Sequence, residues 1–76
     1  MYIVYVARRR RHPHKEIEKA LLSAEQAGFA VVVVNKGHVW GRVVAPNSQE
    51  LTVWGTPRSP ETMAKRVREF VRRYSR

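Results

Sequence analysis

The chain has 76 residues, a length that allows one small domain and excludes a second. It has no cysteine, which excludes disulfide bonds and thiolate metal sites, and the spacing of its three histidines does not suit zinc, so we expect neither a metal nor a cofactor. Fifteen lysines and arginines against six acidic residues give a formal net charge of +9, which favours a polyanionic partner, most often nucleic acid, over a merely soluble basic surface.

Residues 1–11 are predicted to be an N-terminal extension of the domain. Residues 1–6 alternate aromatic and β-branched side chains, which predicts either an added edge strand or a segment ordered by contact. The basic run that follows is either a phosphate-contacting arm or a disordered linker. It consists of Arg8, Arg9, Arg10 and Arg11. No apolar stretch has the length of a signal-peptide core or a transmembrane helix, so we expect a cytoplasmic protein that does not contact a membrane.

Residues 12–27 are predicted to form the first helix. Pro13 suits a first-turn position, because the N–H that proline lacks has no partner there in any case. Glu16 follows where the helix dipole favours an anion, and Gly28 stands where a C-terminal glycine ends a helix. Apolar residues recur at three- and four-residue spacing and predict one buried stripe. They are Ile17, Ala20, Leu21, Ala24 and Ala27.

Three strands are predicted to follow the first helix. Residues 29–34 are a continuous apolar run, as in a strand that is covered on most sides. Residues 35–37 tolerate a positive φ and predict a tight turn into a second strand over 38–45. A turn over 46–49 then leads to a third strand over 50–54. Strands joined by such short loops predict an antiparallel meander.

A second helix is predicted to start after Ser59, a capping residue that Pro60 follows at the first helical position. Its buried stripe is expected to consist of Met63, Val67, Phe70, Val71 and Tyr74. Its remaining surface is strongly basic, with Lys65, Arg66, Arg68, Arg72 and Arg73. The predicted fold class for residues 12–76 is therefore α+β with the order α-β-β-β-α, in which both helices pack on one face of a three-stranded antiparallel sheet, with or without the extra N-terminal strand.

Alternation along the strands predicts which side chains leave the covered face of this sheet. The covered face is expected to carry Val39, Gly41, Val43, Ala45, Leu51 and Val53, and the open face His38, Trp40, Arg42, Val44, Thr52 and Trp54. On the open face, arginine can attract phosphate, tryptophan can stack on bases and histidine can exchange protons. In the alternative interpretation, the two tryptophans pair across strands and His38 only fills a half-exposed position.

Three stretches, in this order, resemble one known family. They are residues 20–29 (ALLSAEQAGF), residues 36–38 (KGH) and residues 55–57 (GTP), the last followed by a basic helix. With them the chain resembles the HicA-like toxins of bacterial toxin–antitoxin systems. The resemblance implies a fold like the double-stranded-RNA-binding domain and an mRNA interferase that a HicB antitoxin masks. In that family a histidine after a glycine is catalytic, which corresponds here to His38 after Gly37, without the serine that usually separates the two.

The resemblance therefore predicts a metal-independent endoribonuclease, with His38 as its catalytic residue on the turn made by Gly37. Lys36 and Arg42, close to His38 in the sequence, are expected to stabilise negative charge on the attacked phosphate. The expected partners are RNA and a HicB-like antitoxin protein, and the expected state is a monomer or a weak homodimer. Besides the arginine run, RNA contacts are expected from Trp40, Trp54, Arg58, Lys65, Arg66, Arg68, Arg72 and Arg73.

Two alternatives belong to other classes of protein. One is a non-catalytic RNA- or DNA-binding module that uses the basic helix and the open sheet face, with His38 contacting nucleic acid or stabilising the hairpin. The other is a small interaction protein that recruits an acidic partner through its open sheet edge. In either case His38 has no chemical role.

Overall fold

A helix, three strands and a second helix follow one another along the chain. The computed structural model describes residues 9–75, so the predictions for residues 1–6 and for Arg8 lie outside the described residues. The elements are α1 (Lys15–Gln26), β1 (Ala30–Lys36), β2 (Val39–Val44), β3 (Glu50–Trp54) and α2 (Pro60–Tyr74). No helix in this part of the chain is long and apolar enough to cross a membrane.

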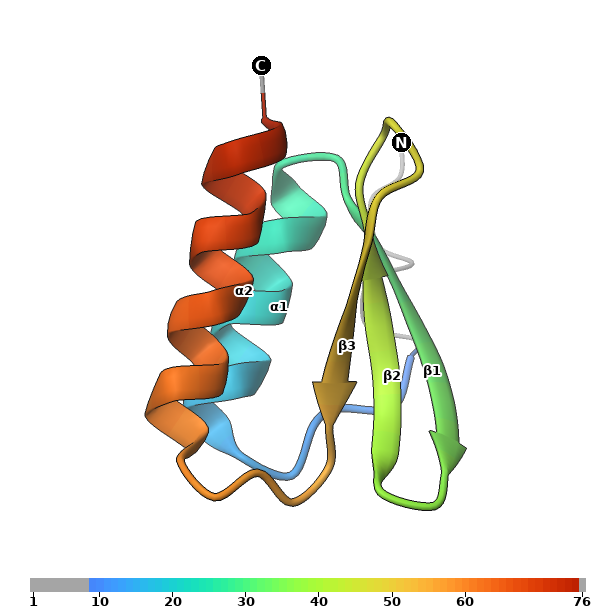
Figure 1. Ribbon diagram of the computed structural model, residues 1–76, viewed down its shortest axis with the longest axis vertical. Coiled ribbons are helices and arrows are strands. Elements are labelled where there is room, and N and C mark those ends of the chain that lie inside the picture. The colour runs from blue at the N-terminus through green and yellow to red at the C-terminus, as the bar shows by residue number, and fades with distance from the viewer. Residues whose placement is uncertain (1–8, 76) are drawn as a thin grey trace.

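The strands form one antiparallel sheet in the order β1-β2-β3, and both helices lie on the same side of it (Figure 1). Each strand pairs with its neighbour in sequence because the connecting turns are short. In Figure 1 the β1–β2 turn, the end of β3 and the start of α2 lie together at one end of the molecule. The predicted α+β fold class is confirmed.

The helix boundaries agree with the prediction in α2 and differ from it in α1. Ser59 caps α2, since its Oγ accepts the main-chain N–H of Thr62 at 3.2 Å. The start predicted for α1 at residue 12 is wrong, because the helix begins at Lys15 and Pro13 precedes it. Gly28 does follow the helix in the left-handed region, with a φ of 92°.

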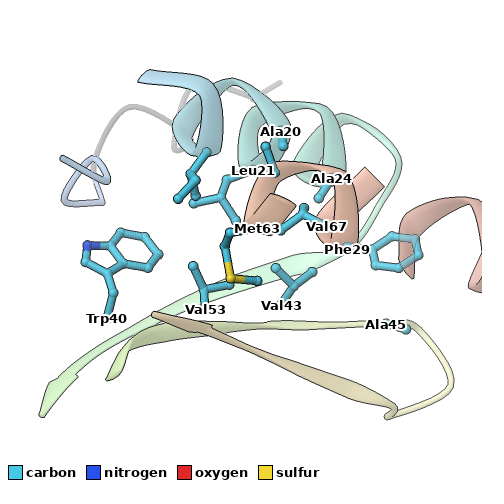
Figure 2. Packing of buried hydrophobic residues seen from close by; sticks show 12 residues of the cluster. Ala20, Leu21, Ala24, Phe29, Trp40, Val43, Ala45, Val53, Met63 and Val67 are labelled. Carbon is cyan, nitrogen blue, oxygen red and sulfur yellow. The ribbon is translucent and has the colours of Figure 1, made fainter. Parts of the chain in front are cut away.

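The core lies between the sheet and the two helices (Figure 2). Its fully buried large side chains come from four elements, so each element contributes to holding the two layers together. They are Ile17, Leu21, Val43, Val53 and Val67. The predicted stripes are largely confirmed, with three differences. Ala27 is exposed just beyond the end of α1, and Ala64, which was not predicted, is buried in α2. Phe70, Val71 and Tyr74 are only partly buried against the core.

The open-face prediction for Trp40 is wrong, because an irregularity in β2 turns this side chain into the core. Val39 pairs with Trp54 and Gly41 pairs with Val53, so Trp40 is one extra residue between two pairs. Trp40 is only 4% exposed. Gly41 permits the irregularity: a Cβ there would collide with the carbonyl oxygen of Val32 in β1.

Candidate nucleic-acid interface

His38 was predicted to be the first residue of the second strand, but it lies in the turn between β1 and β2, one residue before β2 begins. Gly37 shapes this turn with a φ of 61°, a conformation that favours glycine. The main-chain carbonyl of His38 accepts the N–H of Gly55 at 2.9 Å, which ties the turn to the end of β3. The imidazole is exposed and makes no hydrogen bond or ion pair within residues 9–75. It is therefore accessible to a ligand from solvent.

The two cations expected beside His38 are placed differently. Lys36 ends β1 and is exposed in the same turn as His38. Arg42 is exposed on the open face, but it is four residues further along β2, which corresponds to roughly 13 Å of strand. Its Nε also lies 3.5 Å from Glu50 Oε1 on the neighbouring strand. Only Lys36 therefore shares the turn with the histidine.

The remaining cations predicted to contact nucleic acid are exposed. Five belong to α2 and define what we term the basic face: Lys65, Arg66, Arg68, Arg72 and Arg73. Arg58, in the link before α2, is exposed as well. None of these six side chains forms an ion pair with another described residue. Trp54, at the end of β3, is 44% exposed, so it remains accessible where Trp40 is not.

Arg9 belongs to the predicted basic arm but is engaged by α1. Its guanidinium contacts Glu18 Oε2 at 3.0 Å and Glu25 Oε2 at 2.9 Å, and it lies 5.8 Å from the ring centre of Trp40. Burial alone would lower the pKa of Arg9, but its hydrogen bonds to the two glutamates raise it above the ordinary value. Arg9 therefore stabilises the fold, while Arg10 and Arg11 are exposed and their phosphate contacts stay predictions.

His12 has a structural role that the sequence did not reveal. Its ring is 4% exposed and lies 5.0 Å from the ring of Trp40. The main-chain N–H of His14 donates to its Nδ1 at 3.0 Å, so Nε2 carries the proton and donates to the carbonyl oxygen of Trp54 at 2.8 Å. The main-chain N–H of His12 donates to Glu18 at 2.8 Å. These bonds define the backbone before α1 and explain why the helix starts late.

The signal for this network was present in the sequence in part. Glu18 and Glu25 are seven residues apart, which places both carboxylates on one face of α1, separated by two helical turns. A run of arginines precedes this helix in the sequence. No comparable pattern distinguishes His12, because its partner Trp54 is 42 residues away. Within residues 9–75, no three potential ligands are close enough together to hold a metal ion.

The network predicts that stability depends on pH through His12. Burial lowers the pKa of His12 below its ordinary value of 6.5, so below pH 6.5 the unfolded chain binds a proton that the folded chain does not. The free energy of unfolding is expected to be level above about pH 6.5 and to fall as the pH drops from there through the lowered pKa. One proton limits the slope to about 1.4 kcal/mol per pH unit.

Urea titrations between pH 5 and 7 measure this slope. A His12→Phe chain is the control, because it keeps a buried ring in contact with Trp40 but has no group to titrate. An equal slope in both chains would rule out His12 as its origin.

One end of the sheet thus carries an exposed imidazole, an exposed indole and several cations without carboxylate partners in the described chain. Such a set can attract a phosphodiester backbone, stack on a base and transfer a proton. No protein-family model matches the chain, and no curated protein or solved structure is significantly similar to it.

Proposed function

We propose that this chain is a HicA-like toxin that binds RNA and cleaves mRNA with His38 as its single catalytic residue. The observation that carries the proposal is the exposed His38 imidazole on a positive-φ glycine turn, at the end of the sheet where α2 begins. The α-β-β-β-α order agrees with the fold that the HicA-like resemblance implies.

The cleavage needs little from the protein because RNA carries its own nucleophile. The His38 imidazole removes the proton of a 2′-hydroxyl, whose oxygen then bonds to the adjacent phosphorus while the bond from phosphorus to the 5′-oxygen breaks. The imidazolium returns the proton to the departing 5′-oxygen, leaving a 2′,3′-cyclic phosphate and a 5′-hydroxyl. General acid–base catalysis of this kind contributes about 10²–10⁴-fold. Lys36, in the same turn, stabilises the charge that develops on the phosphate.

Binding is attributed to the basic face of α2 together with Arg58. Six exposed cations without carboxylate partners in the described chain favour contact with successive phosphates and a strong dependence on salt. A chain with a net charge of +9 also suits an acidic partner, in line with a HicB-like antitoxin that masks the same surface. The toxin would act in the cytoplasm, where mRNA is found, as a monomer or a weak homodimer.

A non-catalytic RNA-binding module is the second candidate. It is favoured by the isolation of His38, since no second proton-transfer side chain contacts it among residues 9–75. His12, the other histidine near the end of β3, is buried and hydrogen-bonded to Trp54. In that case the same surface would hold RNA without cutting it.

Growth of bacteria that express the chain from an inducible promoter distinguishes the two candidates. Induction is expected to arrest growth and to shorten mRNA, and His38→Ala is expected to relieve both effects. Asn47→Ala, an exposed change in the opposite turn, serves as the control and should remain toxic. Full arrest by a folded His38→Ala chain would exclude His38 as the catalytic residue.

A further inference from the structure

A shallow hollow of about 210 Å³ opens at the edge of the sheet, between the end of β3 and the first turns of α2. It is lined by Trp54, Pro57, Arg58, Ser59, Thr62, Met63 and Arg66. Pockets that enclose a whole drug-sized ligand measure roughly 300–1,000 Å³, so this hollow suits one flat part of a larger ligand. We refer to it as the Trp54 hollow.

The Trp54 indole gives the hollow an accessible aromatic wall. At 44%, Trp54 is the most exposed large hydrophobic residue of the described chain, whereas the other tryptophan is 4% exposed in the core. Trp54 therefore contributes little to the core and leaves much of its ring to a ligand. Stacking of a nucleobase on such a ring raises affinity by roughly 5- to 150-fold per base and tolerates any base.

The charge of the lining favours an anionic ligand. Arg58 and Arg66 both line the hollow, and none of its other residues is acidic. The neighbouring groove along α2 is lined by Arg66 and Arg73, but Glu50 and Glu69 balance these two charges. The Trp54 hollow, with two arginines and no carboxylate, therefore attracts a phosphodiester more strongly. Arginine suits this contact because its planar guanidinium binds phosphate with two parallel hydrogen bonds.

The hollow is adjacent to the turn that carries His38. Trp54 pairs with Val39, the residue after His38, and paired Cα atoms in an antiparallel sheet lie about 5 Å apart. The next residue, Gly55, donates its N–H to the His38 carbonyl at 2.9 Å. The main chain of His38 therefore lies beside the end of β3, and its turn is within reach of a nucleic-acid strand that places a base against Trp54.

We infer that the Trp54 hollow binds one unpaired base of single-stranded RNA, with Arg58 and Arg66 on its phosphates and the neighbouring phosphodiester at His38. This inference rests on the proposed function and names its substrate class. A base within a duplex is covered on both faces by its neighbours, so only an unpaired base can stack on the indole. The protein is then expected to prefer single-stranded RNA over duplex RNA and to show little preference for base sequence. The fold class, by contrast, is one associated with duplex RNA.

Fluorescence anisotropy of labelled RNA tests the inference on the full chain carrying His38→Ala, which keeps the RNA intact. The probes are a short oligouridylate and an RNA duplex of equal length. Trp54→Ala is expected to weaken binding of the single strand about 10-fold and to leave duplex binding unchanged. Trp54→Phe should retain most of the affinity, and Leu22→Ala, an exposed apolar change on α1, should retain all of it.

Salt titrations examine the two arginines. Arg58→Ala and Arg66→Ala are each expected to reduce the slope of log affinity against log salt by about 0.7, the value of one phosphate contact on a single strand. Unchanged single-strand affinity in Trp54→Ala, or equal loss of single-strand and duplex binding, would overturn the inference. Because cleavage plays no part in these titrations, loss of the proposed catalysis leaves their outcome unaffected. If Trp54→Ala still cleaves RNA through His38 at the parental KM, the inference that the Trp54 hollow binds the substrate is overturned, while the proposed catalysis by His38 stands.

Discussion

Purified protein carrying His38→Ala is expected to cleave single-stranded RNA about 10²–10⁴ times more slowly than the parent chain, the contribution typical of one acid–base group. The turn of Gly37 and His38 presents the imidazole to solvent, and alanine removes it. Arg42→Ala should reduce the cleavage rate much less, since Arg42 lies further along β2 and its Nε is already 3.5 Å from Glu50 Oε1. Initial rates on a labelled oligoribonucleotide at several pH values measure both effects.

Two controls accompany this rate measurement. Near-ultraviolet circular dichroism should be the same for His38→Ala and the parent chain, because His38 is exposed and its main-chain bond to Gly55 does not need the side chain. An oligonucleotide with a 2′-deoxy sugar at the scissile position should not be cleaved, because it lacks the nucleophile. Cleavage of the deoxy substrate, or a rate for His38→Ala within a few-fold of the parent rate, would contradict the mechanism.

Replacing Trp40 by alanine is expected to lower the free energy of unfolding by about 3–5 kcal/mol, the usual cost of removing a large buried aromatic side chain. Trp40 belongs to the buried cluster between the sheet and the helices (Figure 2). It also contacts the N-terminal segment, through the ring of His12 at 5.0 Å and the guanidinium of Arg9 at 5.8 Å. The total free energy of unfolding of a small domain is only about 5–15 kcal/mol, so Trp40→Ala brings the protein close to unfolding.

Trp40→Phe separates the packing of this side chain from its polar atom. The Trp40 Nε1 is buried and has no acceptor among the described residues, so phenylalanine removes a donor that gains nothing from its position. Most of the stability should therefore survive in Trp40→Phe. Trp54→Ala should cost far less than Trp40→Ala, because Trp54 is 44% exposed. Urea unfolding provides all three values, and equal losses for Trp40→Ala and Trp54→Ala would contradict the assignment of their positions.

The fold could be predicted from the sequence wherever a local pattern determines the structure. The apolar stripes predicted both helices, Ser59 predicted the start of α2, and the short turns predicted the antiparallel meander. Trp40 was placed on the wrong face because alternation assumes an uninterrupted strand. Gly41 within a strand is the available signal of an interruption, but whether β1 approaches it closely depends on tertiary packing that periodicity does not contain.

The candidate site shows the same division between local and distant interactions. The exposure of the β1–β2 turn and of the cations on α2 follows from a turn motif and from helical spacing. The ion pairs of Arg9 with Glu18 and Glu25 join residues 9 and 16 positions apart. The spacing of the two glutamates indicates a shared helix face, but nothing in the sequence distinguishes Arg9 from the other arginines of the run as their partner. The Trp54 hollow likewise depends on how the end of β3 meets α2.

The hydrogen bond between His12 and Trp54 also has a consequence for the order of folding. It joins residues 42 positions apart, whereas each hairpin of the sheet pairs strands that are neighbours in sequence. Closing the longer loop costs more chain entropy, so the meander can form first and the segment from Arg9 to His14 attaches afterwards. The same segment can then detach without the sheet unfolding, as a local opening that amide hydrogen exchange would detect at the amides of His12, His14 and Glu18 before the centre of β2.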